Sequence, residues 1–253
     1  MTSVIARVPY LNCAPFFDGL ALDGLSEEAS PRQLGASAES GQVTAGPMAL
    51  ADYLRMQDRF ERLGNLGIAV RGRCGSVLLF SKRPIRQLGG MPIAITDQSS
   101  TSAVLLRLLL EQRYQITPSA YLRGLQDDDA AEAILLIGDD ALKFRATNRW
   151  YAYEVDLAFE WWLWQHLPCV FAVWAVRKDA TPAEKQRILR TFQHQLAVNL
   201  SRIGEMAKAR ALELGLPEQD LQAYLENFQY RLSEPEEQAI AQFARLADAH
   251  HLL

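Results

Sequence analysis

The chain has 253 residues, of which 49% are hydrophobic and 22% charged, and its formal net charge is −4. The positive residues are scattered, which argues against a nucleic-acid surface, and no apolar run approaches the roughly 20 residues that span a bilayer. We therefore expect a globular protein with neither nucleic acid nor a membrane as its partner. Because the N-terminal segment lacks the apolar region of a signal peptide, we expect a cytoplasmic location.

The first 82 residues alternate between short strands and a helix. Strands are predicted at 4–8, 42–45, 67–70 and 75–80. Gly46-Pro47 predicts a helix that continues to about residue 60, because proline is favoured in the first helical turn. Pro9 interrupts the first strand, since proline removes a backbone donor, so Asn12 stands at a strand end.

The middle of the chain has the pattern of an inserted α/β unit. Strands are predicted at 92–95, 120–122 and 134–137, and helices at 103–113 and near 156–165. This alternation is typical of a doubly wound sheet. The three aspartates at 127–129 are interpreted as helix capping and solvated charge.

Two long apolar strands, at 73–82 and 167–178, flank the inserted unit, and each ends in charged residues. This arrangement predicts a two-lobed α/β protein with a central cleft. The first lobe is expected to comprise 1–82 plus 174–253, and the second 83–173. Capping boxes at Thr181 and Ser233 predict C-terminal helices that pack on the first lobe. The function should lie in the cleft.

Four consecutive hydroxyl side chains lie where a strand passes into a helix: Ser99, Ser100, Thr101 and Ser102. The start of a helix offers unpaired N–H groups and the positive end of its dipole, so this arrangement suits a carboxylate or a phosphate. Alternatively, one hydroxyl caps the helix and the others are solvated. We favour anion binding, because a cap needs only one hydroxyl.

Three further polar residues are candidates for the cleft. Asp139 follows the strand at 134–137, at the carboxyl end where ligands bind in open α/β sheets, and it is equally well placed to cap the next helix. Asn12 and Ser76 stand at a strand end and a strand start, where a side chain can leave the ladder. Residues in such positions are more often structural than functional. These two nevertheless form the pair in the first lobe that we expect to face the cleft.

Several classes of enzyme are not supported. The chain contains no G-x-S-x-G, H-E-x-x-H, G-x-x-x-x-G-K-[ST] or G-x-G-x-x-G motif. Of its four histidines, two lie in the last four residues and His194 is inside an amphipathic helix, so neither a metal site nor a histidine-based triad is expected. The three widely spaced cysteines are interpreted as small buried hydrophobic residues.

Five segments carry a family resemblance. They are VPYLNCAP at 8–15, SVLLFSKRPI at 76–85, ITDQSSTS at 95–102, LIGDDAL at 136–142 and LPCVFAVWA at 167–175. Taken together and in this order, they resemble the chorismate dehydratase family of the futalosine route to menaquinone. The resemblance runs from about residue 4 to residue 178 and continues more weakly through the helical tail.

The resemblance implies a fold similar to type II periplasmic binding proteins, with two lobes joined by two crossing strands. It implies a lyase that removes water from chorismate, a dicarboxylate, to give 3-[(1-carboxyvinyl)oxy]benzoate, with no metal or other cofactor. The polar groups of that family's site correspond to Asn12 and Ser76 as catalytic residues. The hydroxyl cluster would hold a substrate carboxylate, and Tyr10, Met48 and Asp139 would complete the substrate contacts.

Two alternatives remain at this point. A solute-binding protein shares this architecture without performing a reaction, although the missing export signal argues against it. The sister enzyme of the same pathway, 1,4-dihydroxy-6-naphthoate synthase, uses a similar fold but normally needs a histidine base in the cleft. His166 is the only candidate for such a base before the helical tail.

Overall fold

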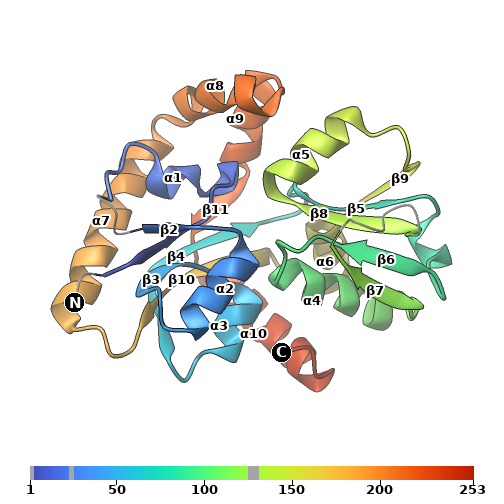
Figure 1. Ribbon diagram of the computed structural model, residues 1–253, viewed down its shortest axis with the longest axis horizontal. Coiled ribbons are helices and arrows are strands. Elements are labelled where there is room, and N and C mark those ends of the chain that lie inside the picture. Colours follow the sequence, from blue (N-terminus) through green and yellow to red (C-terminus); the bar gives the residue numbers. More distant parts are fainter. Residues whose placement is uncertain (1–2, 23–25, 125–130) are drawn as a thin grey trace.

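The computed structural model describes residues 3–22, 26–124 and 131–253, and its strands form two sheets that lie side by side (Figure 1). The first sheet has the order β11 (Phe228–Arg231), β4 (Phe60–Val70), β10 (Cys169–Arg177), β3 (Ala45–Ala49), β1 (Ile5–Arg7) and β2 (Ser26–Glu28). The second has the order β7 (Ala120–Arg123), β6 (Pro92–Ile95), β8 (Ala133–Ile137), β5 (Val77–Ser81) and β9 (Tyr153–Asp156). Both sheets mix parallel and antiparallel pairs.

Helices separate and cover the strands. The first sheet carries α1 (Ala14–Phe17), α2 (Pro31–Glu39), α3 (Leu50–Arg55), α7 (Pro182–Leu200), α8 (Ile203–Leu214), α9 (Glu218–Glu226) and α10 (Glu234–Ala249). The second carries α4 (Thr101–Arg107), α5 (Gly138–Thr147) and α6 (Leu157–Gln165). The single turns η1 (Leu11–Cys13) and η2 (Ile85–Gln87) and the continuation of α4, η3 (Leu108–Arg113), complete the described elements. None of these helices is long and apolar enough to cross a membrane.

The central strands of the second sheet are apolar throughout because both of their faces are covered. In β5, Leu78 and Phe80 belong to a small cluster under α5, where the Phe80 ring lies 4.8 Å from that of Phe144. Val77 and Leu79 point the other way and join the main core. This two-residue alternation explains why a continuous apolar run folds as a strand between two helical layers.

The two long segments that flank the inserted unit do not both end in the first sheet. β10 pairs with β3 and β4 in the first sheet, but β5 pairs with β8 and β9 in the second. The prediction that residues 75–80 complete the first group of strands is therefore wrong. The chain passes between the sheets at 71–76 and again at 166–168. A division into lobes stays a prediction, and a first boundary near residue 76 fits the sheets better than one at residue 82.

The helix predicted from Gly46-Pro47 is also wrong, because residues 45–49 form β3 and the helix α3 begins only at Leu50. Gly46 lies so close to β1 that a Cβ would come within 2.6 Å of the carbonyl oxygen of Ala6. β1 pairs with β3 only at Ala45, so Pro47 disrupts no ladder on that side, while on the other side it lies opposite Trp174 of β10. Tertiary pairing here overrides the local helix signal.

The predicted C-terminal helices are confirmed. Thr181 and Ser233 both form capping boxes at the starts of α7 and α10. Helix α7 packs on the first sheet through Phe192, whose ring lies 4.1 Å from that of Trp174. The predicted capping role of the aspartates at 127–129 lies outside the described residues.

Candidate functional site

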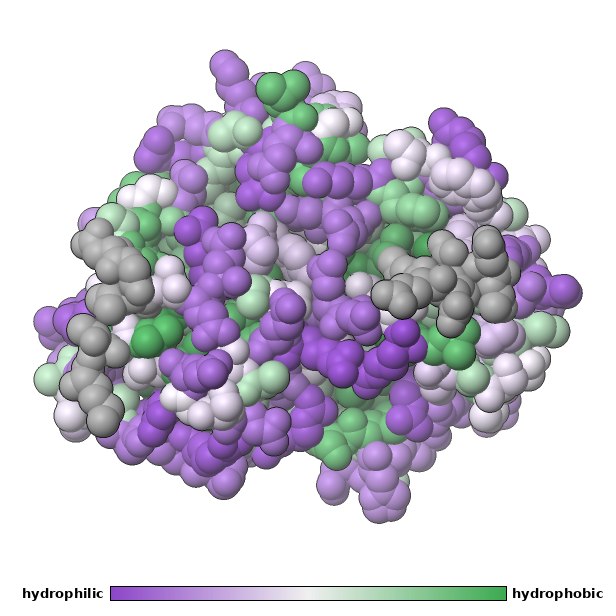
Figure 2. All heavy atoms as spheres, in the orientation of Figure 1, coloured by the Kyte–Doolittle hydropathy of each residue, from purple (hydrophilic) through white to green (hydrophobic). Residues whose placement is uncertain are grey.

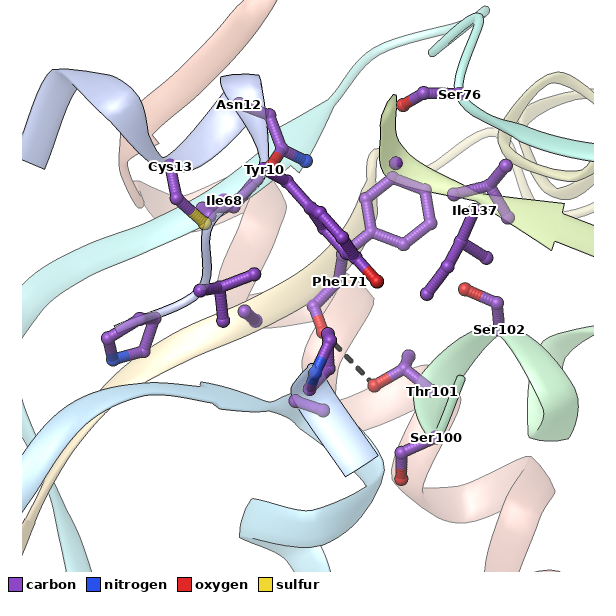
Figure 3. Close-up of a pocket in the computed structure, with 17 residues that line it drawn as sticks. Tyr10, Asn12, Cys13, Ile68, Ser76, Ser100, Thr101, Ser102, Ile137 and Phe171 are labelled. Carbon is purple, nitrogen blue, oxygen red and sulfur yellow. Dashed lines mark hydrogen bonds between the residues drawn. The ribbon is translucent and has the colours of Figure 1, made fainter. Parts of the chain in front are cut away.

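A cavity of about 70 Å³ lies between the two sheets, and both contribute to its walls (Figure 3). From the first sheet and its loops come Val8, Tyr10, Asn12, Cys13, Pro31, Pro47, Ala49, Ile68, Phe171 and Ala172, and from the second come Ser76, Val77, Ser100, Thr101, Ser102, Ile137 and Gly138. On the face shown in Figure 2, mainly hydrophilic residues cover the region where the two sheets meet.

Asn12 faces this cavity from η1, the single turn that follows the proline-interrupted strand β1. Its amide oxygen Oδ1 is buried and has no hydrogen-bond partner among the described residues. In Figure 3 its side chain and that of Ser76 point toward one another across the cavity. A buried acceptor without a partner costs free energy, and Asn12 is the residue among those that line the cavity that carries this cost.

Ser76 lies at the end of the first crossing between the sheets, where the backbone is held firmly. The carboxylate of Asp156 accepts the N–H groups of Cys74 at 2.9 Å and Gly75 at 2.7 Å. Gly75 has a φ of +76°, which favours glycine. The Ser76 side chain is 1% exposed, and its Oγ lies 2.8 Å from the hydroxyl of Tyr224 on α9.

Three of the four hydroxyls at the start of α4 form hydrogen bonds within the protein. Ser99 Oγ accepts the N–H of Ala103 at 3.1 Å and does not line the cavity. Ser100 Oγ donates to Asp52 at 2.7 Å, and in Figure 3 it points away from the cavity. These two hydroxyls stabilise the start of the helix and its contact with α3.

The Thr101 hydroxyl both donates and accepts a hydrogen bond. Its Oγ1 donates to the carbonyl of Phe171 at 3.0 Å and accepts the N–H of Ala51 at 3.2 Å, so it joins α4 to β10 and α3. Ser102 differs, because its hydroxyl has no recorded partner among the described residues and points into the cavity (Figure 3). Of the four hydroxyls, Ser102 is the one that is free to bind a ligand.

Tyr10 packs over the start of α5 and spans the junction between the sheets. Gly138 has a φ of +60°, and a Cβ there would lie 2.7 Å from the Tyr10 ring, so glycine is required on both grounds. The Tyr10 hydroxyl donates to Gln98, whose amide in turn donates to Asp140 at 2.8 Å. Burial, reinforced by Asp140 and Asp139, raises the pKa of the Tyr10 phenol above its usual range.

Asp139 and Met48 lie outside the cavity, contrary to the expectation for substrate contacts. Asp139 accepts the N–H of Leu11 at 2.8 Å and pairs with Arg210 on α8 at 2.6 Å, so it connects α5 to the first-sheet side. Its pKa is raised, because burial outweighs the effects of Leu11 and Arg210. Met48 is buried beside α2, where it lines a separate small gap with Leu34.

The walls of the cavity carry no charged side chain among the described residues that line it. The exposed His166 caps the end of α6 and does not line it either. In the described part of the chain, no three His, Cys, Asp or Glu side chains are grouped to hold a metal. The N-termini of α4, which continues without a break into η3, and of α5, whose first residue is Gly138, both reach the cavity and contribute positive potential.

Sequence reasoning missed several residues that shape this site. Phe171 and Tyr224 belong to elements interpreted only as a crossing strand and a packing helix, and no local signal marks them. Asp52, which binds Ser100, lies in a helix that was predicted with the wrong start. The glycine at 138 is the exception, since its place between an apolar strand and a helix start indicates a special backbone conformation.

Comparisons with known proteins agree with this architecture. A family model described as menaquinone biosynthesis matches residues 3–249. A chorismate dehydratase of Thermus thermophilus is 34% identical over 261 residues, which cover 95% of this chain and 93% of that protein.

Solved structures show the fold. A protein of Archaeoglobus fulgidus has a TM-score of 0.78 at 19% identity, covering 98% of this chain and 97% of that one. The periplasmic aliphatic sulphonate binding protein of Escherichia coli has a TM-score of 0.64 at 15% identity, covering 100% of this chain and 89% of that one. The expected likeness to periplasmic binding proteins is confirmed. By its family match and its curated relative, the chain belongs to the menaquinone biosynthesis family, the family of chorismate dehydratase.

Proposed function

We propose that this protein binds chorismate in the cavity between its two sheets and removes water from it, giving 3-[(1-carboxyvinyl)oxy]benzoate. The observation that carries the proposal is the set of polar side chains that line one cavity, at Asn12, Ser76 and Ser102, in a chain that resembles a chorismate dehydratase over nearly its full length. A cytoplasmic location stays a prediction.

The reaction suits a site of this kind because the substrate supplies much of the driving force. Conjugation through the ring diene to the carboxylate makes the C3 hydrogen of chorismate acidic, and loss of the C4 hydroxyl leaves an aromatic ring. The C3–H and C4–O bonds break, the electron pair of the former completes the ring, and the proton leaves with the hydroxyl as water. The protein has to fix the geometry and exclude bulk water.

The lining residues offer no strong base. The cavity is lined by no histidine, aspartate, glutamate or lysine among the described residues. Burial raises the pKa of the Cys13 thiol and of the Tyr10 phenol, so both remain protonated near neutral pH. We therefore assign the proton-accepting role to a carboxylate of the substrate itself.

The polar residues then have distinct roles. The Asn12 amide can accept a hydrogen bond from the departing hydroxyl through its oxygen, which has no partner among the described residues, or donate through its Nδ2 to the carboxylate that takes the proton. Ser76, opposite Asn12, orients the ring substituents. Ser102 and the free N–H groups at the start of α4 bind a carboxylate, for which a helix N-terminus is a favourable site.

Incubating the purified protein with chorismate tests the proposal. We expect the chorismate to disappear and an aromatic product 18 mass units lighter to accumulate, faster than in a buffer control. Binding of chorismate without a product would indicate a solute-binding protein instead. Turnover of a different pathway intermediate, with chorismate untouched, would indicate the sister enzyme.

A further inference from the structure

Tyr224 is the protein's own hydrogen-bond partner for Ser76, although it does not line the cavity. It lies on α9, in the C-terminal helical segment, 148 positions along the chain from Ser76. The two hydroxyl oxygens are 2.8 Å apart, and the Tyr224 ring packs edge-on against Phe228 at 5.0 Å. A helix of the first-sheet side therefore reaches a residue in the wall of the cavity through a hydrogen bond.

The Tyr224 hydroxyl keeps its proton. Its side chain is 8% exposed, and burial raises the pKa of the phenol well above the usual value, with Asp139 and Cys74 adding to the effect. A buried neutral phenol carries one proton and must donate it to avoid the cost of an unsatisfied donor.

The direction of the bond follows from the acceptors at hand. Among the described residues, Ser76 Oγ is the only recorded hydrogen-bond partner of the Tyr224 hydroxyl. If Ser76 donated, the phenol proton would have no acceptor in its buried surroundings. If Tyr224 donates, the Ser76 proton remains free, and the cavity that Ser76 lines can supply an acceptor for it.

We propose that Tyr224 is a positioning residue that donates to Ser76 and thereby makes Ser76 a directed hydrogen-bond donor to an oxygen of the substrate. The inference rests on the proposed function and extends it beyond the residues that touch the ligand. Tyr224 fixes which way one hydroxyl of the site points, and it stays outside the cavity itself.

A double-mutant cycle tests this role. Tyr224→Phe keeps the ring and its packing, and we expect it to lower kcat/KM for chorismate on the order of tenfold, the worth of one positioned hydrogen bond. Ser76→Ala should lower kcat/KM at least as much. The double variant should resemble Ser76→Ala alone, because Tyr224 acts only through Ser76. Additive losses, or an unchanged Tyr224→Phe variant, would overturn the inference.

Tyr230→Phe is the matched control. Tyr230 is equally buried, lies on the neighbouring strand β11, and donates to the Leu225 carbonyl at 3.4 Å instead of to a site residue. It should share any general effect on the unfolding temperature but leave kcat/KM unchanged. Wild-type turnover tests the proposed function separately. Should the wild type bind chorismate without converting it, the same cycle is measured on Kd by calorimetry, with the same expected non-additivity.

Discussion

The polar side chains on the two walls of the cavity differ in whether the protein itself pairs them. At the start of α4, Ser100 donates to Asp52, while Thr101 donates to the Phe171 carbonyl and accepts from the Ala51 N–H. All three partners belong to the first-sheet side. On the facing wall, the Asn12 amide oxygen is buried without any partner. The segment richest in hydroxyls therefore mainly holds the two sides together, and the groups available to a ligand are those that the protein leaves unpaired.

This contrast has an energetic consequence. An unsatisfied buried polar group costs about 1–3 kcal/mol, so the empty protein carries that cost at Asn12 and recovers it when a ligand bonds the amide. The hydrogen bonds of Thr101 do the opposite, since they stabilise the contact of α4 with β10 and α3 whether or not a ligand is bound. Substitutions on the two walls should therefore separate activity from stability.

The largest effect is expected at Asn12. Asn12→Ala should lower kcat by about 10²-fold, the usual loss when a group that bonds the developing transition state is removed. Its unfolding free energy should not fall, because the buried oxygen has no partner to lose. Steady-state kinetics with chorismate and urea unfolding measure the two quantities.

Asn199→Ala provides the matched control for that prediction. The Asn199 amide is fully buried and donates to the carbonyls of Pro15 and Asp18. Removing it should cost about 1–3 kcal/mol of unfolding free energy and leave kcat unchanged. Equal kinetic losses in the two variants would show that Asn12 acts through structure and not through the substrate.

Thr101→Val should give the next largest effect, on stability. Valine has nearly the same shape but leaves the Ala51 N–H and the Phe171 carbonyl without their partner, which should cost about 1–3 kcal/mol of unfolding free energy. Thr96→Val is the comparison, because Thr96 is equally buried and makes one long local bond of 3.4 Å to the Gln98 N–H. Similar losses at both positions would contradict the bridging role of Thr101.

A smaller, kinetic effect is expected at Ser102. If this hydroxyl binds a substrate carboxylate in the ground state and in the transition state alike, Ser102→Ala should raise KM about tenfold with little change in kcat. Ser99→Ala removes a neighbouring hydroxyl that bonds the Ala103 N–H and does not line the cavity. Ser99→Ala should leave KM unchanged. A rise in KM for this control would contradict the assignment of Ser102, and not Ser99, as the hydroxyl that binds the substrate.

The sequence predicts those parts of the site that depend on local patterns, but not those that depend on hydrogen bonds between residues far apart in the chain. Asn12 and Ser76 stand next to a chain interruption and a strand start, so local pattern and family resemblance together place them in the cavity. The hydrogen-bond partners of Thr101 lie 50 and 70 positions away from it in the sequence. Tyr224 and Ser76, which bond each other, are 148 positions apart. Local patterns contain no information on such pairings, so the cluster's division into binding and bridging hydroxyls could not be predicted.

The error at Met48 has a different origin. A proline at position 47 is compatible both with a helix start and with a strand that is poorly paired on one side, and the local signal favours the helix. The structure decides for the strand because β10 pairs along all of β3. Successive side chains of a strand point to opposite faces, so Pro47 and Ala49 line the cavity while Met48 is buried beside α2.

The smallest expected effect concerns Asp52, which accepts a hydrogen bond from Ser100 at the start of α4. Its Oδ1 accepts from Ser100 and Arg55, but its Oδ2 is buried without a partner beside Gly35. Burial raises the pKa of this carboxyl above its ordinary value of 3.8, and the bonds from Ser100 and Arg55 only partly oppose the shift. Between 3.8 and the raised pKa, the folded protein therefore binds more protons than the unfolded chain.

The sign of the pH dependence follows from that excess of protons. The contribution of Asp52 to the unfolding free energy becomes more favourable as pH falls through its raised pKa toward 3.8, and it is constant below that range. Asp52→Asn removes the titration, so the wild type should gain stability relative to this variant when urea unfolding is compared at pH 7 and pH 4. Taking the difference between the two proteins cancels the contribution of Asp139, whose pKa is raised in the same direction. If the difference in unfolding free energy between the two proteins stays constant from pH 7 to pH 4, Arg55 and Ser100 fully compensate the burial of the Asp52 carboxylate. The charge of Asp52 would then have no net effect on folding.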